Sequence, residues 1–443
     1  MFIKKQNPRQ VAVKVLTEVL ENKKALKFAL TEETLSQFDK VNRAFLLEII
    51  YGVLRNLFAI DWVLEEFYKN KESLSSNTIN NLRCSFYQLM FMNIPAYAVT
   101  NEAVNTEKAF LGKPAVVNAI IRAFLRKYET EDLPSFFHNS KVFSDYELRA
   151  KKIPPNLSIA FSHPEWLIKR WSNRFSQEEL VELLKANNEK APISIAVKPE
   201  EREEIAEYFQ KKGFKSRPTK HSPAGLIIEG QGYDIRKTLT EAPFFWVVQD
   251  EASQLVCFYL EPFEGATVLD TCSSPGGKTI LTAALMKKGK ILCLENSRIR
   301  MKLLHNNLKR IKRFIPNVEI QTKLVDVLEF QTKATFDRVL LDAPCSSLGV
   351  IRRNPDVRYR LEESEIKRLA ETQKLMIEKV SSFVSPQGIL IYSVCSTEKE
   401  EGEEVVDSFL QKRPEFSSIK ILRTFPHLDG MDGFFIAKLL RRE

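Results

Sequence analysis

Apolar residues recur at helical spacing through the first third of the chain. Between Pro8 and Tyr128 they return every three or four positions, the period of an α-helix with one buried face. Only two glycines, Gly52 and Gly112, interrupt this stretch. The pattern predicts an all-helical bundle over residues 1–130.

The hydrophobic pattern changes twice beyond this bundle. Residues 131–160 are polar and irregular and end near a Pro-Pro pair, which is typical of a linker. Residues 161–235 combine helical and strand-like stretches and predict a small α+β module. Its elements are expected at Pro164–Asn187 (helix), Pro192–Lys198 (strand), Glu200–Lys212 (helix) and Gly225–Glu229 (strand).

The last part of the chain, residues 236–443, alternates short apolar strands with amphipathic helices. This alternation predicts a parallel sheet with helices on both faces, a Rossmann-like α/β domain. A chain of 443 residues is long enough for several such domains, so we expect a multidomain protein. The strands of the α/β domain are expected at Thr267–Asp270, Ile291–Glu295, Val339–Asp342 and Ile389–Tyr392.

The balance of charge favours a polyanionic partner. The chain carries 66 Lys and Arg against 57 Asp and Glu, a net charge of +9. Of these, 18 basic and 13 acidic side chains fall in residues 1–130. Nucleic acid is the leading hypothesis, because basic proteins bind its phosphates. A solvated helix face without a ligand explains the N-terminal excess about as well.

The cysteines and the hydropathy of the chain indicate in which cellular compartment the protein is expected. The six cysteines form no C-x-x-C pair and are too few for a disulfide framework in so long a chain. We therefore expect reduced thiols and no metal site. The first residues lack the apolar core of a signal peptide, and no uninterrupted run of about 18 apolar residues occurs. A cytoplasmic protein that is not embedded in a membrane is expected.

The turn after the first expected strand of the α/β domain has the features of a ligand-binding loop. It runs from Thr271 to Thr279 and contains a glycine pair, which allows backbone amides to approach a ligand closely. It is not a P-loop, because Cys272 stands where that motif requires glycine. Glu295 ends the next strand, at the spacing where a carboxylate reaches ribose hydroxyls. Asp326 is a candidate for an adenine amino group, although a single acid after a strand is more often a cap.

Two cysteines follow two later strands at the same expected edge. Cys345 comes after the strand that ends at Asp342, and Cys395 after the strand that ends at Tyr392. A single cysteine is more often a small buried hydrophobe, but two beside a cofactor loop favour chemistry. A thiolate can add to carbon 6 of a pyrimidine and so activate carbon 5 for methylation by S-adenosylmethionine. Asp342 is then a candidate donor to N3 of the base, and Lys278 a candidate source of positive charge.

Two groups of cations are candidates for phosphate contacts. Seven Lys and Arg residues lie between Arg298 and Arg313 without an acidic residue among them. An exposed, soluble helix face explains this first group nearly as well. Arg352 and Arg353 gain more from their position, because they come just after the Cys345 loop.

Three motifs together resemble the RNA cytosine-5 methyltransferases of the Sun/Nop2 group. They are Asp-x-Cys-x-x-Pro-Gly-Gly-Lys-Thr at 270–279, Asp-Ala-Pro-Cys-Ser at 342–346 and Tyr-x-x-Cys-Ser at 392–396. The resemblance implies that Cys395 is the nucleophile and that Cys345 assists release. It also implies S-adenosylmethionine as the cofactor. The implied cofactor contacts are Cys272, Ser273, Ser274, Pro275, Gly276, Gly277, Lys278, Glu295, Asp326 and Asp342.

The resemblance covers nearly the whole chain. Lys40–Asn56 and Tyr87–Pro95 are similar to the NusB-like domain of the bacterial branch that methylates small-subunit ribosomal RNA. This implies a NusB-like RNA-binding domain over residues 1–130 and a methyltransferase domain over residues 236–443. The implied product is 5-methylcytidine in small-subunit (16S) ribosomal RNA. A monomer is expected, although the sequence leaves the oligomeric state open. Shorter similarities lie at His163–Arg170, Val248–Ser253 and Asp432–Lys438.

Four positions depart from the family's pattern. Ser273 and Ser274 replace the usual Ala-Ala, Val394 replaces the threonine before the nucleophile, and Gly402 replaces the asparagine of Glu-Asn-Glu. None of these changes removes a reacting group. The expected reaction is therefore unchanged, whereas rate and target choice are left open.

Two other readings compete with an RNA methyltransferase. In a DNA cytosine methyltransferase the Pro-Cys cysteine attacks, which would make Cys345 the nucleophile; the presence of Cys395 argues against it. A non-enzymatic antitermination factor with a decayed catalytic domain would explain the NusB-like part, but Lys278, Asp342 and both cysteines are retained. The sequence leaves open which cytidine is modified and whether free RNA or an assembling subunit is the substrate.

Overall fold

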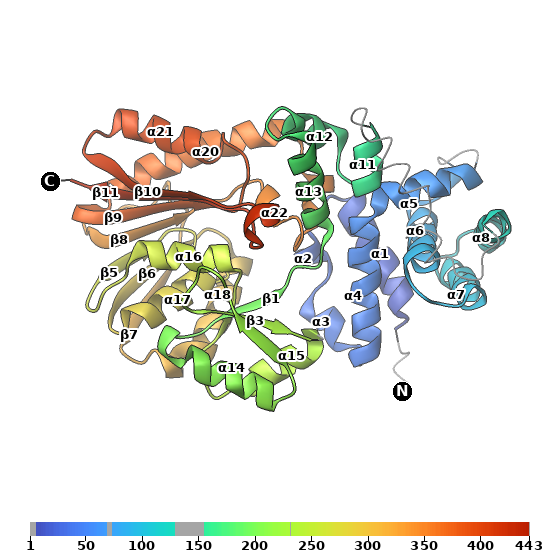
Figure 1. Cartoon of the computed structure of the whole chain (residues 1–443), viewed down its shortest axis with the longest axis horizontal. Helices are drawn as coiled ribbons and strands as arrows, with labels where there is room; N and C mark the ends of the chain where they lie inside the picture. Colours follow the sequence, from blue (N-terminus) through green and yellow to red (C-terminus); the bar gives the residue numbers. More distant parts are fainter. Residues whose placement is uncertain (1–5, 69–72, 129–154, 231, 443) are drawn as a thin grey trace. The chain divides into compact units, whose positions relative to one another are not determined.

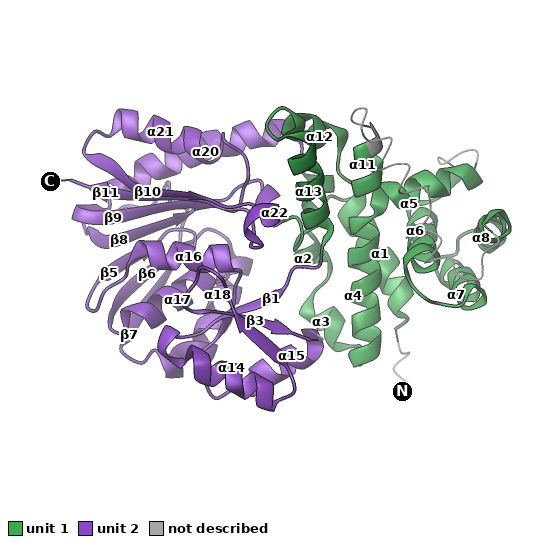
Figure 2. Ribbon diagram, in the orientation of Figure 1, with its two compact units in different colours: residues 1–189, 351–361 green, residues 190–350, 362–443 purple. Residues whose placement is uncertain are grey.

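The computed structural model describes residues 6–68, 73–128, 155–230 and 232–442 (Figure 1). The chain divides into two compact units (Figure 2). Unit 1 comprises residues 1–189 and 351–361, and unit 2 comprises residues 190–350 and 362–443. Most of the linker expected at 131–160 lies outside the described residues, and its last residues, from Pro155, begin a helix.

Unit 1 is built from helices whose apolar faces share one core. Helix α1 begins after Asn7, whose side chain accepts a hydrogen bond from Arg9 N at 2.9 Å, and Pro8 suits the first helical position. Leu16 and Phe124 are fully buried in the core. The helices are α1 (Pro8–Leu20), α2 (Leu26–Ala29), α3 (Glu32–Ser36), α4 (Lys40–Arg55), α5 (Leu57–Leu64), η1 (Glu65–Phe67), α6 (Ser76–Phe91), α7 (Ala96–Ala109), α8 (Pro114–Lys127), α11 (Pro155–Phe161), α12 (Glu165–Ser172) and α13 (Gln177–Asn188).

Unit 1 also contains a segment from the second half of the chain, residues 351–361, with helix α19 (Val357–Arg360). The fully buried Arg358 anchors it by donating hydrogen bonds to Phe161 O at 3.1 Å, Ser162 O at 2.9 Å and Asn188 Oδ1 at 2.9 Å. The residues that follow the Cys345 loop therefore fold with the N-terminal helices. No local pattern in the sequence indicates this pairing.

Unit 2 begins with a small antiparallel sheet of order β2-β3-β1-β4. Ile195, Leu226 and Phe209 are buried between the sheet and its helices. A small α+β module is present, and its strand at Gly225–Glu229 has the expected bounds. The single helix expected at Pro164–Asn187 is instead two helices, α12 and α13, and both belong to unit 1 rather than to this module. Its elements are β1 (Ile193–Ala196), η3 (Pro199–Glu201), α14 (Arg202–Lys211), β2 (Lys215–Pro218), β3 (Gly225–Glu229), α15 (Gly232–Thr240) and β4 (Val247–Val248).

The rest of unit 2 is a seven-stranded sheet of order β10-β11-β9-β8-β5-β6-β7 with helices on both faces (Figure 1). Side chains alternate between two cores: Val268 and Leu340 pack with α16 and α17, and Leu269 and Leu341 pack with α20 and α21. The elements are α16 (Glu251–Leu260), β5 (Thr267–Asp270), α17 (Gly277–Met286), β6 (Gly289–Glu295), α18 (Arg298–Ile311), η4 (Lys312–Phe314), β7 (Val318–Leu324), β8 (Phe336–Asp342), η5 (Leu348–Val350), α20 (Glu363–Ser381), β9 (Val384–Val394), α21 (Glu403–Lys412), β10 (Phe416–Arg423), α22 (Pro426–Asp429) and β11 (Phe435–Arg441).

The sheet is mixed, which differs from the parallel sheet that the strand–helix alternation predicts. Strands β5 to β9 are parallel, but β11 pairs antiparallel with β9, and β10 pairs antiparallel with β11. The expected fold class, a helical N-terminus followed by a Rossmann-like domain, is nevertheless confirmed. In the part of the chain that the structure describes, no helix is long and apolar enough to cross a membrane.

Parallel pairing brings the predicted chemistry to one edge of the sheet. Strand β5 lies between β6 and β8, and β8 pairs with β9 so that Asp342 is level with Ser393. The carboxyl ends of these strands carry the Thr271–Thr279 loop, the Cys345 loop and Cys395. Ligands bind at such edges in open α/β sheets.

Candidate active site

The loop after β5 has the shape of a cofactor cradle. Gly276 has a φ of +104°, a conformation that favours glycine, and it caps the N-terminus of α17. Ser273 Oγ donates to Asp270 O, and Ser274 Oγ donates to Arg300 O, both at 2.8 Å. The two hydroxyls that depart from the family's Ala-Ala are thus satisfied within the protein. Cys272, before them, is partly buried, and Pro275 O, between them and α17, accepts from an asparagine of α18.

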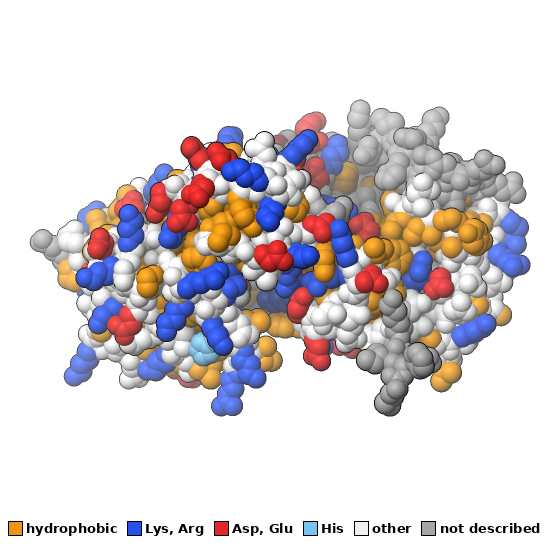
Figure 3. All heavy atoms as spheres, turned by 90° about the horizontal axis from the view of Figure 1, so that it is seen from below, with side chains coloured by type: hydrophobic (Ala, Val, Ile, Leu, Met, Phe, Trp, Pro, Cys, Tyr) orange, Lys and Arg blue, Asp and Glu red, His pale blue; other side chains and the backbone are white. Residues whose placement is uncertain are grey.

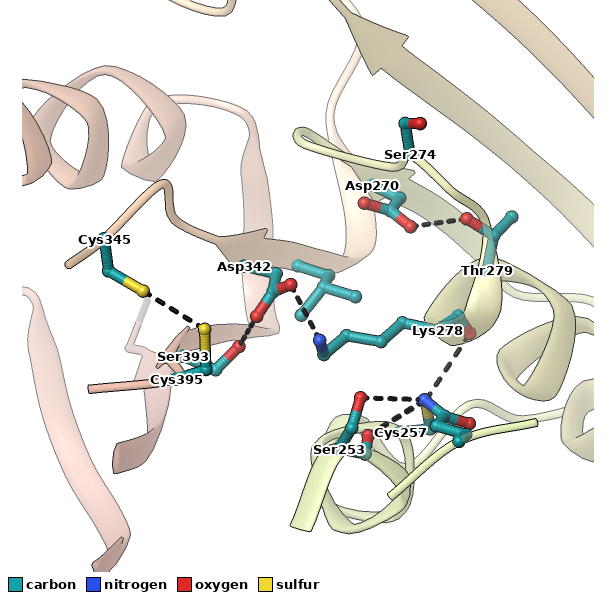
Figure 4. A network of polar contacts seen from close by, with 12 residues as sticks. Ser253, Cys257, Asp270, Ser274, Lys278, Thr279, Asp342, Cys345, Ser393 and Cys395 are labelled. Atoms are coloured by element: carbon teal, nitrogen blue, oxygen red, sulfur yellow. Dashed lines mark hydrogen bonds and ion pairs between the residues drawn. The ribbon is translucent and has the colours of Figure 1, made fainter. Parts of the chain in front are cut away.

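Asp270, at the end of β5, is a site residue that sequence reasoning missed. It is buried, and its Oδ2 accepts a hydrogen bond from Thr279 Oγ1 at 2.6 Å (Figure 4). Its Oδ1 has no hydrogen-bond partner among the described residues. Burial raises the pKa of Asp270 to about 6, against the opposing hydrogen bond from Thr279. Its place as the last strand residue before the glycine-containing loop is the signal that identifies it.

The two acids predicted to contact a nucleoside differ in their surroundings. Glu295 is 3% exposed; its Oε1 accepts from Ser297 N at 2.9 Å and its Oε2 lies 3.2 Å from Arg300 Nη2. Asp326 is partly exposed, and its two oxygens accept from Asn296 Nδ2 at 3.1 Å and from a backbone N–H at 2.9 Å. Both lie beyond the carboxyl ends of neighbouring strands.

These residues fit S-adenosylmethionine. The cofactor offers an ammonium group, a ribose diol and an adenine amino group, which require hydrogen-bond acceptors. The unpartnered Asp270 Oδ1 is suited to a cation, and Glu295 stands at the spacing for a diol. Among the described residues, no group of three or more His, Cys, Asp or Glu side chains is arranged to hold a metal ion.

A partly buried ion pair links the cofactor loop to the cysteine loops. Lys278 Nζ lies 2.7 Å from Asp342 Oδ2, and Ser393 Oγ donates to Asp342 Oδ1 at 2.8 Å (Figure 4). Burial acts to lower the pKa of Lys278, but the charge and hydrogen bond of Asp342 outweigh it and the pKa is raised. Lys278 therefore supplies a fixed positive charge. Ser393, which sequence reasoning missed, holds the second oxygen of Asp342.

The two predicted cysteines face each other. Cys345 Sγ and Cys395 Sγ are 3.3 Å apart (Figure 4). Ser347 Oγ lies 3.6 Å from Cys395 Sγ. A hydrogen bond from Cys345 lowers the pKa of Cys395 despite burial, and Lys278 adds to the effect. That hydrogen bond, burial and the charge of Glu401 raise the pKa of Cys345. This arrangement favours a thiolate at Cys395 and a thiol at Cys345.

The predicted phosphate contacts belong to a different unit from the residues just described. Arg352 and Arg353 belong to unit 1; Arg352 is 4% exposed, and its carbonyl oxygen accepts from Arg55 Nη2 at 3.4 Å. Their role as RNA contacts stays a prediction.

The cation run on α18 divides into two sets. Arg300 contacts Glu295, and Arg310 lies over the Trp246 ring at 3.8 Å, so both have partners within unit 2. Lys312 and Arg313, the last members of the run, belong to η4, and the exposed Arg313 donates a hydrogen bond to Ala242 O at 3.4 Å. The other members are exposed, and Figure 3 shows Lys and Arg side chains spread over one face of the molecule with acidic ones among them. The exposed set is Arg298, Lys302, Lys309, Lys312 and Arg313.

Three segments of the chain each match a known protein family. The family described as 16S rRNA methyltransferase RsmB/F matches residues 257–440. The NusB family matches residues 6–126. The ferredoxin-like domain of RsmF/B-like methyltransferases matches residues 163–236.

Curated relatives and a solved structure are similar over the full length. The chain is 30% identical to a probable ribosomal RNA small subunit methyltransferase B of Bacillus subtilis, over 99% of this chain and 100% of the relative. It is 28% identical to the ribosomal RNA small subunit methyltransferase B of Photorhabdus laumondii, over 98% and 99%. The crystal structure of PH0851 aligns with a TM-score of 0.74 and 25% identity, covering 98% of each chain.

Proposed function

Because the chain belongs to the ribosomal RNA small subunit methyltransferase B family, we propose that it methylates carbon 5 of a specific cytidine in 16S ribosomal RNA through a covalent cysteine adduct. The family match makes the chain an S-adenosylmethionine-dependent methyltransferase of ribosomal RNA. It confirms the family resemblance, the NusB-like part and the cofactor that the motifs predict. The base, the atom and the adduct are the proposal.

One observation carries the proposal: two thiols lie 3.3 Å apart with opposite pKa shifts at the edge of the sheet beside the cofactor loop. Methylation of a ring nitrogen or a ribose hydroxyl needs no cysteine. Carbon 5 of cytosine is a poor nucleophile until a group adds at carbon 6, and a thiolate is suited to that addition. A second thiol beside the first suits the release step.

In the proposed reaction, Cys395 adds to carbon 6 of the base, and the carbon 5 thus activated receives the methyl group. S-adenosylmethionine, when bound, supplies that methyl group. A water molecule then takes the carbon-5 proton, the electron pair of that bond expels sulfur from carbon 6, and the thiolate of Cys395 is regenerated. Cys345 assists this release from 3.3 Å away. A base in a stem must first be extruded, at a cost of a few kcal/mol.

Lys278 and Asp342 have roles in charge placement. Asp342 is proposed to face N3 of the base, where charge develops during addition, and to donate a hydrogen bond there with a proton relayed from the adjacent Lys278 ammonium. Lys278, 2.7 Å from Asp342, places a buried positive charge beside the reacting groups. The cofactor is proposed to lie against Cys272–Lys278, Glu295, Asp326 and Asp342, with the helical residues 1–130 binding RNA. The ribosomal RNA substrate places the proposed reaction in the cytoplasm.

The direct test is nucleoside analysis of modified RNA. Wild-type protein, S-adenosylmethionine and unmodified small-subunit ribosomal RNA should yield 5-methylcytidine at one position after digestion and mass spectrometry. Free RNA and a partly assembled subunit are offered in parallel. Methylation at another atom or base would overturn the proposal, and methylation of a DNA duplex in preference to RNA would favour the DNA reading. Failure to bind S-adenosylmethionine by calorimetry would favour the decayed-domain reading.

A further inference from the structure

A fully buried carboxylate lies behind the two cysteines and has no role in the reaction just described. Glu401 is 0% exposed. Its Oε1 accepts hydrogen bonds from Ser346 N at 2.8 Å and from Gln373 Nε2 at 3.1 Å. Its Oε2 accepts from Ser346 Oγ and Ser396 Oγ, each at 2.5 Å. Four uncharged donors therefore converge on this carboxylate.

Each of the two serines directly follows one of the cysteines in the sequence. Ser346 follows Cys345 in the loop after β8, and Ser396 follows Cys395 after β9. The two hydroxyl oxygens are 3.0 Å apart and share Oε2 of Glu401. The carboxylate thus ties two separate loops together at points one residue from each sulfur.

Glu401 is itself held in place from two sides. Its carbonyl oxygen accepts from the Tyr392 hydroxyl at 2.5 Å, and that hydroxyl also lies 3.2 Å from Gln373 Oε1. Gln373 Nε2 donates to Pro344 O at 2.9 Å, on the residue before Cys345. A buried network with its members satisfied has one arrangement, because each alternative leaves a polar group unpaired.

We propose that Glu401 is a positioning residue for methyl transfer: by holding Ser346 and Ser396 together, it keeps Cys345 Sγ within 3.3 Å of Cys395 Sγ. The inference rests on the proposed two-cysteine function. The carboxylate also places its negative charge on the Cys345 side of the pair, where it disfavours a second thiolate. The hydrogen-bond network around Glu401 therefore favours a thiol at Cys345 and leaves the thiolate to Cys395.

The first test measures the spacing of the sulfurs without RNA or cofactor. Diamide oxidises the two thiols by taking up two electrons and two protons, and a Cys345–Cys395 disulfide forms, which peptide mapping detects. We expect Glu401→Ala to form this disulfide about tenfold more slowly than wild type, because the sulfurs lose their fixed approach. Glu401→Gln should stay close to wild type, since its amide oxygen accepts from Ser346 N and both hydroxyls can accept from its amide nitrogen.

A matched control lies at the other end of β8. Asp337 Oδ2 accepts from Thr267 N and Thr267 Oγ1, both at 2.8 Å, and so ties β8 to β5 away from the cysteines. Asp337→Ala should leave the rate of disulfide formation unchanged. An equal slowing in Asp337→Ala and Glu401→Ala would show general loosening of the sheet and overturn the proposal.

The second test is kinetic. Glu401→Ala should lower kcat about 100-fold, the effect of a misplacement of about 1 Å, with the KM for RNA and the Kd for S-adenosylmethionine unchanged. Glu401→Gln should restore most of kcat. If Glu401→Ala does not fold, as shown by loss of cofactor binding, a milder variant replaces it. Ser396→Ala removes one of the four donors to Glu401 and should lower both the disulfide rate and kcat by a smaller factor. Wild-type disulfide rates and kcat in these variants overturn the inference. An inactive wild type whose disulfide rate still depends on Glu401 overturns the proposed function and supports the positioning.

Discussion

At the scale of single residues, the site depends on an unequal pair of sulfurs. Two thiols at 3.3 Å do not both ionise readily, because the second negative charge is repelled by the first. Cys345 donates its hydrogen bond to Cys395, with Lys278 acting in the same direction. The charge of Glu401 acts on Cys345 instead. In the proposed reaction, the environment of the two cysteines, more than their identity, determines which one attacks.

The pH dependence of thiol alkylation tests this inequality. The lowered pKa of Cys395 means that its thiolate is present at lower pH than for an ordinary cysteine, whose pKa is 9.0. Cys345→Ala removes the main cause, so the pKa should rise and the alkylation midpoint of Cys395 should move to higher pH. Iodoacetamide labelling followed by mass spectrometry measures it, with Cys272→Ala as the control. A midpoint that stays or falls in Cys345→Ala would contradict the assignment.

Sequence alone identifies the residues of the cofactor loop and both cysteines, because their motifs are local. It does not identify Ser393 or Glu401, whose roles depend on the pairing of β8 with β9 and on the packing of α20. Glu401 lies in a run of acidic residues that is typical of a solvated helix start. Its burial is a property of the folded chain and has no local signal.

At the scale of elements, the accuracy of prediction follows burial. Strand β5 was expected at Thr267–Asp270 and lies there, because its apolar residues form an uninterrupted buried run. Strand β10 was not expected, since most of its residues are at least partly exposed and only Phe416 is buried. Strand β11 is buried over most of its length, but only the four-residue helix α22 separates it from β10, so the strand–helix alternation does not predict this antiparallel pair.

The segment with α19 makes a prediction at this scale. Arg358→Met removes the donor to two carbonyl oxygens and to Asn188, which leaves buried acceptors unpaired. We expect the free energy of unfolding to fall by about 2–4 kcal/mol, measured by urea denaturation. The exposed Arg126 of α8 is the control, and Arg126→Met should cost less than about 0.5 kcal/mol. Equal costs would show that the Arg358 contacts do not anchor the segment.

At the scale of the whole molecule, the exposed cations of α18 are the candidate site at which the excess of positive charge contacts RNA. The exposed cations of α18 have no acidic neighbour on that helix. Replacing Lys302, Lys309 and Lys312 by glutamine should weaken the salt dependence of RNA binding. The slope of log K against log salt is negative, and its magnitude should decrease by about 2 to 3, because each phosphate contact contributes about 0.7–0.9. Filter binding at several salt concentrations measures it.

The control for that experiment uses three exposed lysines in a charge-balanced region, Lys211, Lys212 and Lys215. Their glutamine variants should change the slope less. An unchanged slope in the α18 variant would show that the cations between Arg298 and Arg313 form a solvated helix face and do not contact RNA. An equal change in both would show attraction by net charge alone.

The most direct measurement for the account as a whole is a search for a protein–RNA adduct that survives denaturation. Wild type, Cys345→Ala and Cys395→Ala are incubated with small-subunit ribosomal RNA and S-adenosylmethionine and run on a denaturing gel. The account predicts that Cys345→Ala accumulates the adduct, because release is impaired, and that Cys395→Ala forms neither adduct nor 5-methylcytidine. An adduct with Cys395→Ala and none with Cys345→Ala would make Cys345 the nucleophile and contradict the account.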